Sequence, residues 1–169
     1  METTVKLYSL PYRSIKTYAA TILFIAGNII LPQLFHLIPQ GGITWLPIYF
    51  FTLIGAYKYG WRVGLLTAIA SPLINSWLFG MPAVAVLPAI LLKSGLLACI
   101  AGLAAQHFHK ITLLILLGVV LSYQILGTLG EWLINRDFYL AIQDFRIGIP
   151  GMLLQIFGGY FFIKYLIRK

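Results

Sequence analysis

The sequence predicts an all-α integral membrane protein: a single membrane-embedded domain over residues 1–169, folded as a bundle of six transmembrane helices with both termini cytoplasmic. Three observations lead to this prediction. Hydrophobic residues make up 60% of the chain and charged residues 9%, whereas soluble domains average roughly 45–50% and 25%. Apolar stretches of about 20 residues recur along the chain, which is the length that crosses a bilayer. Lysine and arginine concentrate in alternate connections between these stretches.

Three helices are expected in the first half of the chain. An apolar helix over residues 14–34 leads into a loop without lysine or arginine. A short helix over residues 45–57 and a third over residues 61–79 follow, with a tight basic connection between them. Polar residues of the third helix recur at i, i+4 and i+8, so they share one helical face. They are Thr67, Ser71 and Asn75.

Three further helices are expected over residues 83–106, 111–131 and 147–166. The loop of residues 132–146 is the most polar segment of the chain, and its Asp137 and Asp144 are expected to be solvated. A second polar stripe with helical spacing begins in the fifth helix and ends in this loop. It consists of Gln124, Thr128, Glu131 and Asn135.

The distribution of basic residues predicts the topology. With an even number of spans both termini share one side, and that side collects nine of the 12 lysines and arginines, against two on the other side. By the positive-inside rule the side with nine is cytoplasmic. We therefore expect a multi-pass membrane protein with both termini on the cytoplasmic side. The nine residues are Lys6, Arg13, Lys16, Lys58, Arg62, Lys110, Lys164, Arg168 and Lys169.

Lys93 is the foremost candidate for a functional residue. It follows Pro82 by eleven residues, which at about 1.5 Å per residue is roughly 16 Å, the middle of a hydrocarbon core about 30 Å thick. A lysine at that depth needs a partner or a hydrated cavity, because its insertion costs about 2.5–3.5 kcal/mol. Two interpretations are open: Lys93 binds an anionic group of a ligand, or it forms a structural ion pair, for example with Glu131.

Other polar residues in the outer halves of the spans could bond to a ligand, and tryptophans near the outer boundary could stack on it. Both groups also have a simpler explanation, because amides and hydroxyls join membrane helices and aromatic residues form interfacial belts. The polar candidates are Asn75, Gln124 and Glu131, and the tryptophans are Trp45 and Trp77.

The sequence offers no set of residues for catalysis, a metal or a cofactor. Ser-His-Asp, HExxH and phosphate-loop patterns are absent, and His107 and His109 alternate, so they do not face one site on a helix. We therefore expect no enzymatic activity. The net charge of +8 is explained by the basic flanks of the spans, so a nucleic-acid partner is not expected.

One segment carries a family resemblance. IGAYKYGWRVGLLTAIASPLINSWLFGMP, at residues 54–82, places Gly-Ala before a short basic turn, then a glycine-containing span and a Gly-Met-Pro turn. Here the chain resembles the substrate-binding S components of energy-coupling-factor (ECF) vitamin transporters, and its size and expected six-helix layout agree over its whole length. The resemblance implies a membrane-embedded binder for a vitamin-like molecule, which works with a membrane scaffold subunit and two ATPase subunits.

The resemblance also implies positions for the two functional surfaces. The family's ligand site lies near the outer face, in elements that here contain Asn75, Trp77, Lys93, Gln124, Glu131, Asn135 and Arg136. The family's Ala-x-x-x-Ala contact motif on the first helix is not present in strict form. Small residues of that helix would take its place in docking to the scaffold subunit: Ala19, Ala20, Ala26 and Gly27.

These observations favour a non-enzymatic substrate-binding subunit of an ECF-type ABC importer, whose ligand is a small anionic or zwitterionic micronutrient. The alternative is a small membrane scaffold subunit, similar to the rod-shape proteins of cell-wall machinery, which would bind a protein partner and no ligand. A membrane enzyme would require a nucleophile or a metal set.

Overall fold

The computed structural model describes residues 5–167, and these residues form helices joined by loops, with no strand among them. Five helical segments are long and apolar enough to cross a membrane. The chain is therefore a multi-pass, all-helical membrane protein. The five segments are α1 (Ile15–Phe35), α4 (Trp61–Phe79), α5 (Leu87–Phe108), α6 (Leu113–Asn135) and the last segment, Ile149–Leu166.

The last segment is a continuous helix with two wider π-helical stretches. Residues 132–146, expected as a solvated loop, contain two short helices that fold back toward the bundle before this segment begins. They are α7 (Phe138–Ala141) and α8 (Gln143–Arg146). The last segment consists of α9 (Ile149–Leu153), η2 (Leu154–Gly158), α10 (Gly159–Phe161) and η3 (Phe162–Leu166).

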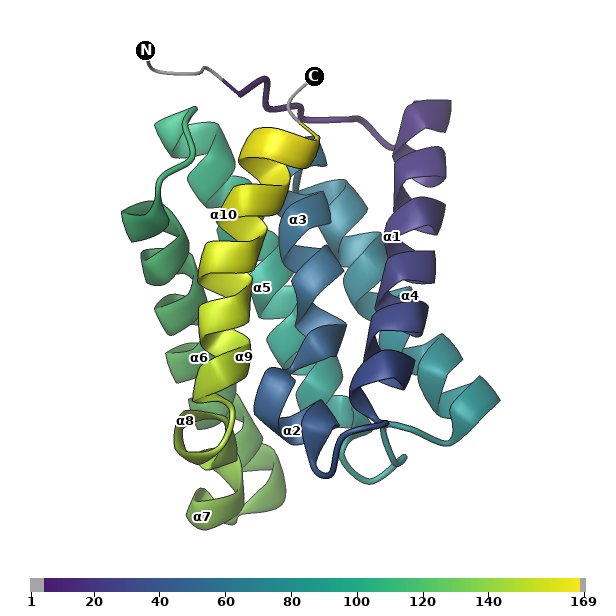
Figure 1. The fold of residues 1–169 in the computed structure, drawn as a ribbon, viewed down its shortest axis with the longest axis vertical. Helices are drawn as coiled ribbons and strands as arrows, with labels where there is room; N and C mark the ends of the chain where they lie inside the picture. The colour runs from purple at the N-terminus through teal and green to yellow at the C-terminus, as the bar shows by residue number, and fades with distance from the viewer. Residues whose placement is uncertain (1–4, 168–169) are drawn as a thin grey trace.

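The expected second span differs most from the structure. In its place the chain forms α2 (Gly41–Trp45), the 3-10 turn η1 (Pro47–Tyr49) and α3 (Phe50–Tyr59). α3 has only 10 residues, about 15 Å, which is half the thickness of a bilayer core. It lies in the middle of the bundle (Figure 1) and packs against α1, α4 and α5. Its apolar sequence thus reflects burial by other helices on nearly all sides.

The helical segments run alternately up and down, so the two ends of the described chain lie at the same end of the bundle (Figure 1). Seven lysines and arginines lie at this end. All three acidic residues of the described range, Glu131, Asp137 and Asp144, belong to the opposite end. Arg168 and Lys169, which the topology count includes, lie outside the described residues. The seven are Lys6, Arg13, Lys16, Lys58, Arg62, Lys110 and Lys164.

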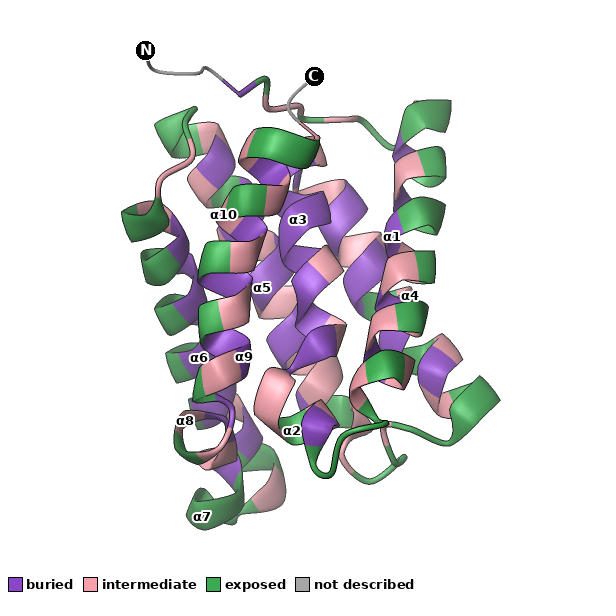
Figure 2. Cartoon of the chain, in the orientation of Figure 1, coloured by how far each residue is buried: buried purple, intermediate pink, exposed green. Residues whose placement is uncertain are grey.

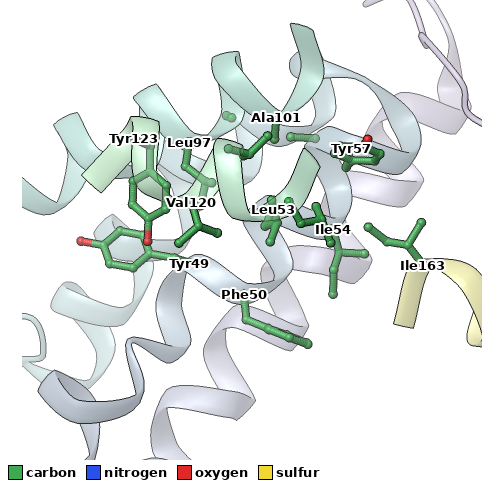
Figure 3. Close-up of a cluster of buried hydrophobic side chains, with 14 of the residues drawn as sticks. Tyr49, Phe50, Leu53, Ile54, Tyr57, Leu97, Ala101, Val120, Tyr123 and Ile163 are labelled. Carbon is green, nitrogen blue, oxygen red and sulfur yellow. The ribbon is translucent and has the colours of Figure 1, made fainter. Parts of the chain in front are cut away.

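The core contains both apolar and polar side chains. Figure 2 shows exposed residues along the outward sides of α1, α6 and the last segment, and buried residues on their inward sides. Figure 3 shows the apolar centre, where Leu53 and Ile54 of α3 meet Leu97 of α5 and Val120 of α6, all fully buried. The polar stripes also face inward, as their spacing predicts. Thr67, Ser71, Asn75, Gln124, Thr128 and Glu131 are buried.

Candidate functional site

A cavity of about 300 Å³ opens at the end of the bundle away from the termini. The segment around α2 and η1, the first turns of α5, the last turns of α6 and the short helices α7 and α8 supply its lining. Most of this lining is aliphatic. The polar exceptions are Tyr49, Lys93, Glu131, Gln143 and Asp144.

Three charged residues of this cavity, the charged cluster Lys93, Glu131 and Asp144, form one ion-paired group. The ammonium of Lys93 lies 2.5 Å from Oε2 of Glu131 and 2.8 Å from Oδ2 of Asp144. All three residues are more than nine-tenths buried. The structure therefore pairs Lys93 with Glu131, one of the two open interpretations, and adds a second carboxylate that the sequence did not suggest.

Lys93 lies closer to the end of its helix than expected. α5 begins at Leu87 rather than at residue 83, because residues 80–86 form a loop. Lys93 is therefore six residues, roughly 9 Å, from the first residue of the helix. The charged cluster thus lies near one end of the bundle, where a cavity can reach it.

The position of the Lys93 side chain depends on a glycine of the neighbouring helix. A Cβ atom placed on Gly127 of α6 would lie 2.6 Å from Cγ of Lys93, which is too close for two carbon atoms. Gly127 and Glu131 are four residues apart and share one face of α6. The lysine stem therefore crosses α6 at Gly127 and its ammonium reaches Glu131 one turn later.

Asp144 corrects the expectation that the loop aspartates are solvated. α8 packs back onto the bundle and buries this carboxylate against Lys93, whereas Asp137 is exposed and caps α7 through Leu140. No sequence pattern pointed to Asp144, because α8 has only four residues and is too short to show a helical periodicity.

Tyr49 of η1 also lines the cavity. It is 3% exposed, and its ring centroid lies 5.7 Å from that of Tyr123 (Figure 3). Its hydroxyl makes no hydrogen bond to any residue in the described part of the chain. The lining of the cavity thus includes a tyrosine whose hydroxyl is unused by the described residues.

The other predicted ligand residues lie away from this lining. Trp77 is 84% exposed on the outside of α4, and Trp45 stacks on Phe35 with ring centroids 5.4 Å apart. Arg136 is exposed at the end of α6, next to the half-buried Asn135. Of the predicted set, the structure brings Lys93 and Glu131 together at the cavity.

Gln124 lies deeper in the bundle than the charged cluster. It is fully buried and donates to the hydroxyl of Tyr123 at 3.2 Å, and that hydroxyl donates to Oε1 of Gln155 at 2.8 Å. Through the hydroxyl of Tyr123, the side chain of Gln124 is linked to Gln155 of the last segment. Polar side chains commonly join membrane helices in this way.

Asn75 belongs to a second polar group, which joins α1, α3 and α4. It donates to the backbone carbonyl of Asn28 at 2.9 Å. The side chain of Asn28 donates to Thr52 and Ser71 and accepts from the backbone N–H of Phe51 at 3.1 Å, near the start of α3. We call Asn28, Thr52, Ser71 and Asn75 the asparagine cluster.

A smaller apolar cavity of about 280 Å³ adjoins the first one. The two share Gly42, Ile43, Ile48, Val86 and Ile90, and the second extends between the end of α1 and the loop at Met81 and Pro82. The charged cluster is therefore at one side of a longer, mostly aliphatic space.

The small residues of α1 do not form one surface. Ala19 and Ala26 are exposed on the outward side, whereas Ala20 and Gly27 are half-buried and turned toward the bundle. A Cβ atom on Gly27 would lie 2.7 Å from the ring of Phe51. Gly27 therefore serves packing within the chain, and only Ala19 and Ala26 are accessible.

Comparisons with family models, with curated proteins and with solved structures find no match to this chain. The length and hydropathy of its helices establish a multi-pass helical membrane protein. Any more specific function must therefore be argued from the cavity and its charges.

Proposed function

We propose that the chain is the membrane-embedded substrate-binding subunit, or S component, of an ECF-type importer in a bacterial or archaeal cytoplasmic membrane. The observation that carries the proposal is the cavity of about 300 Å³ with the buried charged cluster in its wall. Its volume is at the lower end of the range for small-molecule sites, which suits a ligand of vitamin size.

The placement of the charges supports binding rather than packing. Replacing a buried ion pair by apolar residues of similar volume is often neutral or stabilising, so a bundle gains little stability from such a pair. Ionisable residues inside membrane proteins mark ligand or ion pathways by default. Here they line a cavity that is otherwise mostly aliphatic, which is the common composition of a ligand site.

The charge asymmetry of the bundle supports capture from outside the cell. Seven basic residues and no described acidic residue lie at the end that contains the termini. The positive-inside rule makes this end cytoplasmic. The cavity then opens toward the outer face, where an importer meets its substrate.

The proposed partners are a membrane scaffold subunit and two ATPase subunits. The chain contains no GxxxxGK[ST] phosphate loop, so ATP hydrolysis would be supplied by other subunits. The outward side of α1 offers the exposed small residues Ala19 and Ala26 for close helix contact. A photo-crosslinking residue at Ala26 should capture the scaffold subunit, and one at Leu114, exposed on α6, should not.

Native mass spectrometry of the purified protein tests the binding function. Wild-type protein should retain a small molecule after incubation with a metabolite extract. Val86→Trp fills the space shared by the two cavities and should abolish the bound mass. Val84→Trp is the matched control, because Val84 is 77% exposed in the same loop. Protein that stays empty in every sample would favour the scaffold alternative.

A further inference from the structure

We propose that the ligand of this cavity carries a net positive charge, as an ammonium, an amidinium or a cationic heterocycle, and that Glu131 and Asp144 bind it. The inference rests on the proposed binding function of the cavity. It replaces the expectation of a ligand carboxylate beside Lys93.

The first argument for a cationic ligand is the net charge of the charged cluster. Two ionised carboxylates and one ammonium leave a formal charge of −1 in a buried site. The nearest basic residue in sequence, Arg146, is exposed and lies over the ring of Tyr139 at 3.8 Å. Within residues 5–167 no second cation pairs with either carboxylate. A cationic ligand would complete this balance.

The second argument is that some oxygen atoms of the cavity wall have no hydrogen-bond partner among the described residues. Oε1 of Glu131 and Oδ1 of Asp144 accept no hydrogen bond from the described residues, and neither does the hydroxyl of Tyr49. The three residues are 8%, 8% and 3% exposed, and all line the cavity. Carboxylate oxygens only accept hydrogen bonds, so they fit a ligand that donates N–H groups.

An anionic ligand would meet the opposite arrangement. The ammonium of Lys93 is already within 3 Å of two carboxylate oxygens, and a third anion beside them would be repelled in a medium where charges interact strongly. Apart from Gln143, the rest of the wall is aliphatic, and the face of the Tyr49 ring can attract a cation. The ligand is therefore a compact cation with an apolar body.

The test uses the small-molecule extract of cells that make the protein, separated by ion exchange at pH 7 into cationic, unretained and anionic fractions. Purified protein is incubated with each fraction and analysed by native mass spectrometry. The bound mass should come from the cationic fraction. A bound mass from the unretained or the anionic fraction would overturn the inference but leave the binding function standing. Protein that stays empty with all three fractions would overturn the binding function as well.

Neutral variants give a second, independent readout. Glu131→Gln and Asp144→Asn each bring the formal charge to zero and leave Lys93 one carboxylate partner. Each should weaken binding of the identified cation by at least about tenfold, because a buried charge pair is lost. Asp137→Asn, an exposed neighbour, is the control and should bind within about twofold of wild type. Unchanged affinity in both cavity variants, with wild-type helicity, would overturn the inference.

Discussion

The asparagine cluster and the charged cluster are both buried in the same bundle, but they differ in what surrounds their polar atoms. In the asparagine cluster, the side chain of Asn28 bonds to Thr52, Ser71 and the backbone of Phe51. In the charged cluster, one oxygen of each carboxylate accepts no hydrogen bond from the described residues, and both residues line a cavity. The asparagine cluster is satisfied except for Oδ1 of Asn75 and lies outside the lining of that cavity, so its hydrogen bonds join helices. Unused oxygens beside a cavity are available to a ligand.

The largest expected effect comes from Lys93→Met, which leaves two buried carboxylates without a counter-ion. Breaking a buried pair by removing one partner costs about 3–5 kcal/mol. We expect a strong fall in thermal stability, measured on ligand-free protein in detergent. Thermal stability equal to wild type would mean that hydration or protonation of the carboxylates, rather than Lys93, compensates their charge.

Asn28→Ala should have the next largest effect, on stability alone. It removes the acceptor of the Phe51 N–H and the donor to Thr52 and Ser71, at about 1–3 kcal/mol for buried groups left unpaired. Ligand affinity, measured on the folded fraction, should stay at the wild-type value. A loss of affinity at wild-type stability would show that the asparagine cluster is part of the ligand site.

Gly127→Ala should disturb the charged cluster through packing alone. The new methyl group would press on the stem of Lys93, and overpacking of this kind costs about 1–3 kcal/mol. Because the ammonium must move, ligand affinity should fall severalfold. Gly118→Ala on the same helix is the matched control, since a Cβ there meets nothing within 4 Å. Equal behaviour of the two variants would contradict the packing described for Lys93.

Trp77→Ala should have the smallest effect. Its side chain is 84% exposed and lies outside the cavity lining, so stability should change by less than about 0.5 kcal/mol. Ligand affinity should also be unchanged in an isothermal titration. A clear loss of affinity would assign Trp77 to a lid that closes over the cavity.

The sequence predicted those parts of the structure that depend on helical periodicity. The inward stripes at Thr67, Ser71 and Asn75 and at Gln124, Thr128 and Glu131 follow from side chains three or four residues apart sharing a face. The burial of Asp144 was not predictable in this way, because it depends on how a nonperiodic segment folds back on helices distant in sequence. The short second helix was counted as a span for a related reason: an apolar segment has the same composition whether lipid or other helices surround it.

The most direct test of the account is to neutralise the whole charged cluster at once, with Lys93→Met, Glu131→Gln and Asp144→Asn in one chain, and to measure stability and ligand occupancy on the same sample. A buried ion group replaced by neutral residues of similar volume often leaves stability unchanged or raised. We therefore predict an unfolding free energy within about 1 kcal/mol of wild type and no bound molecule in native mass spectrometry. Wild-type ligand occupancy in this variant would contradict the assignment of the charged cluster as the binding site.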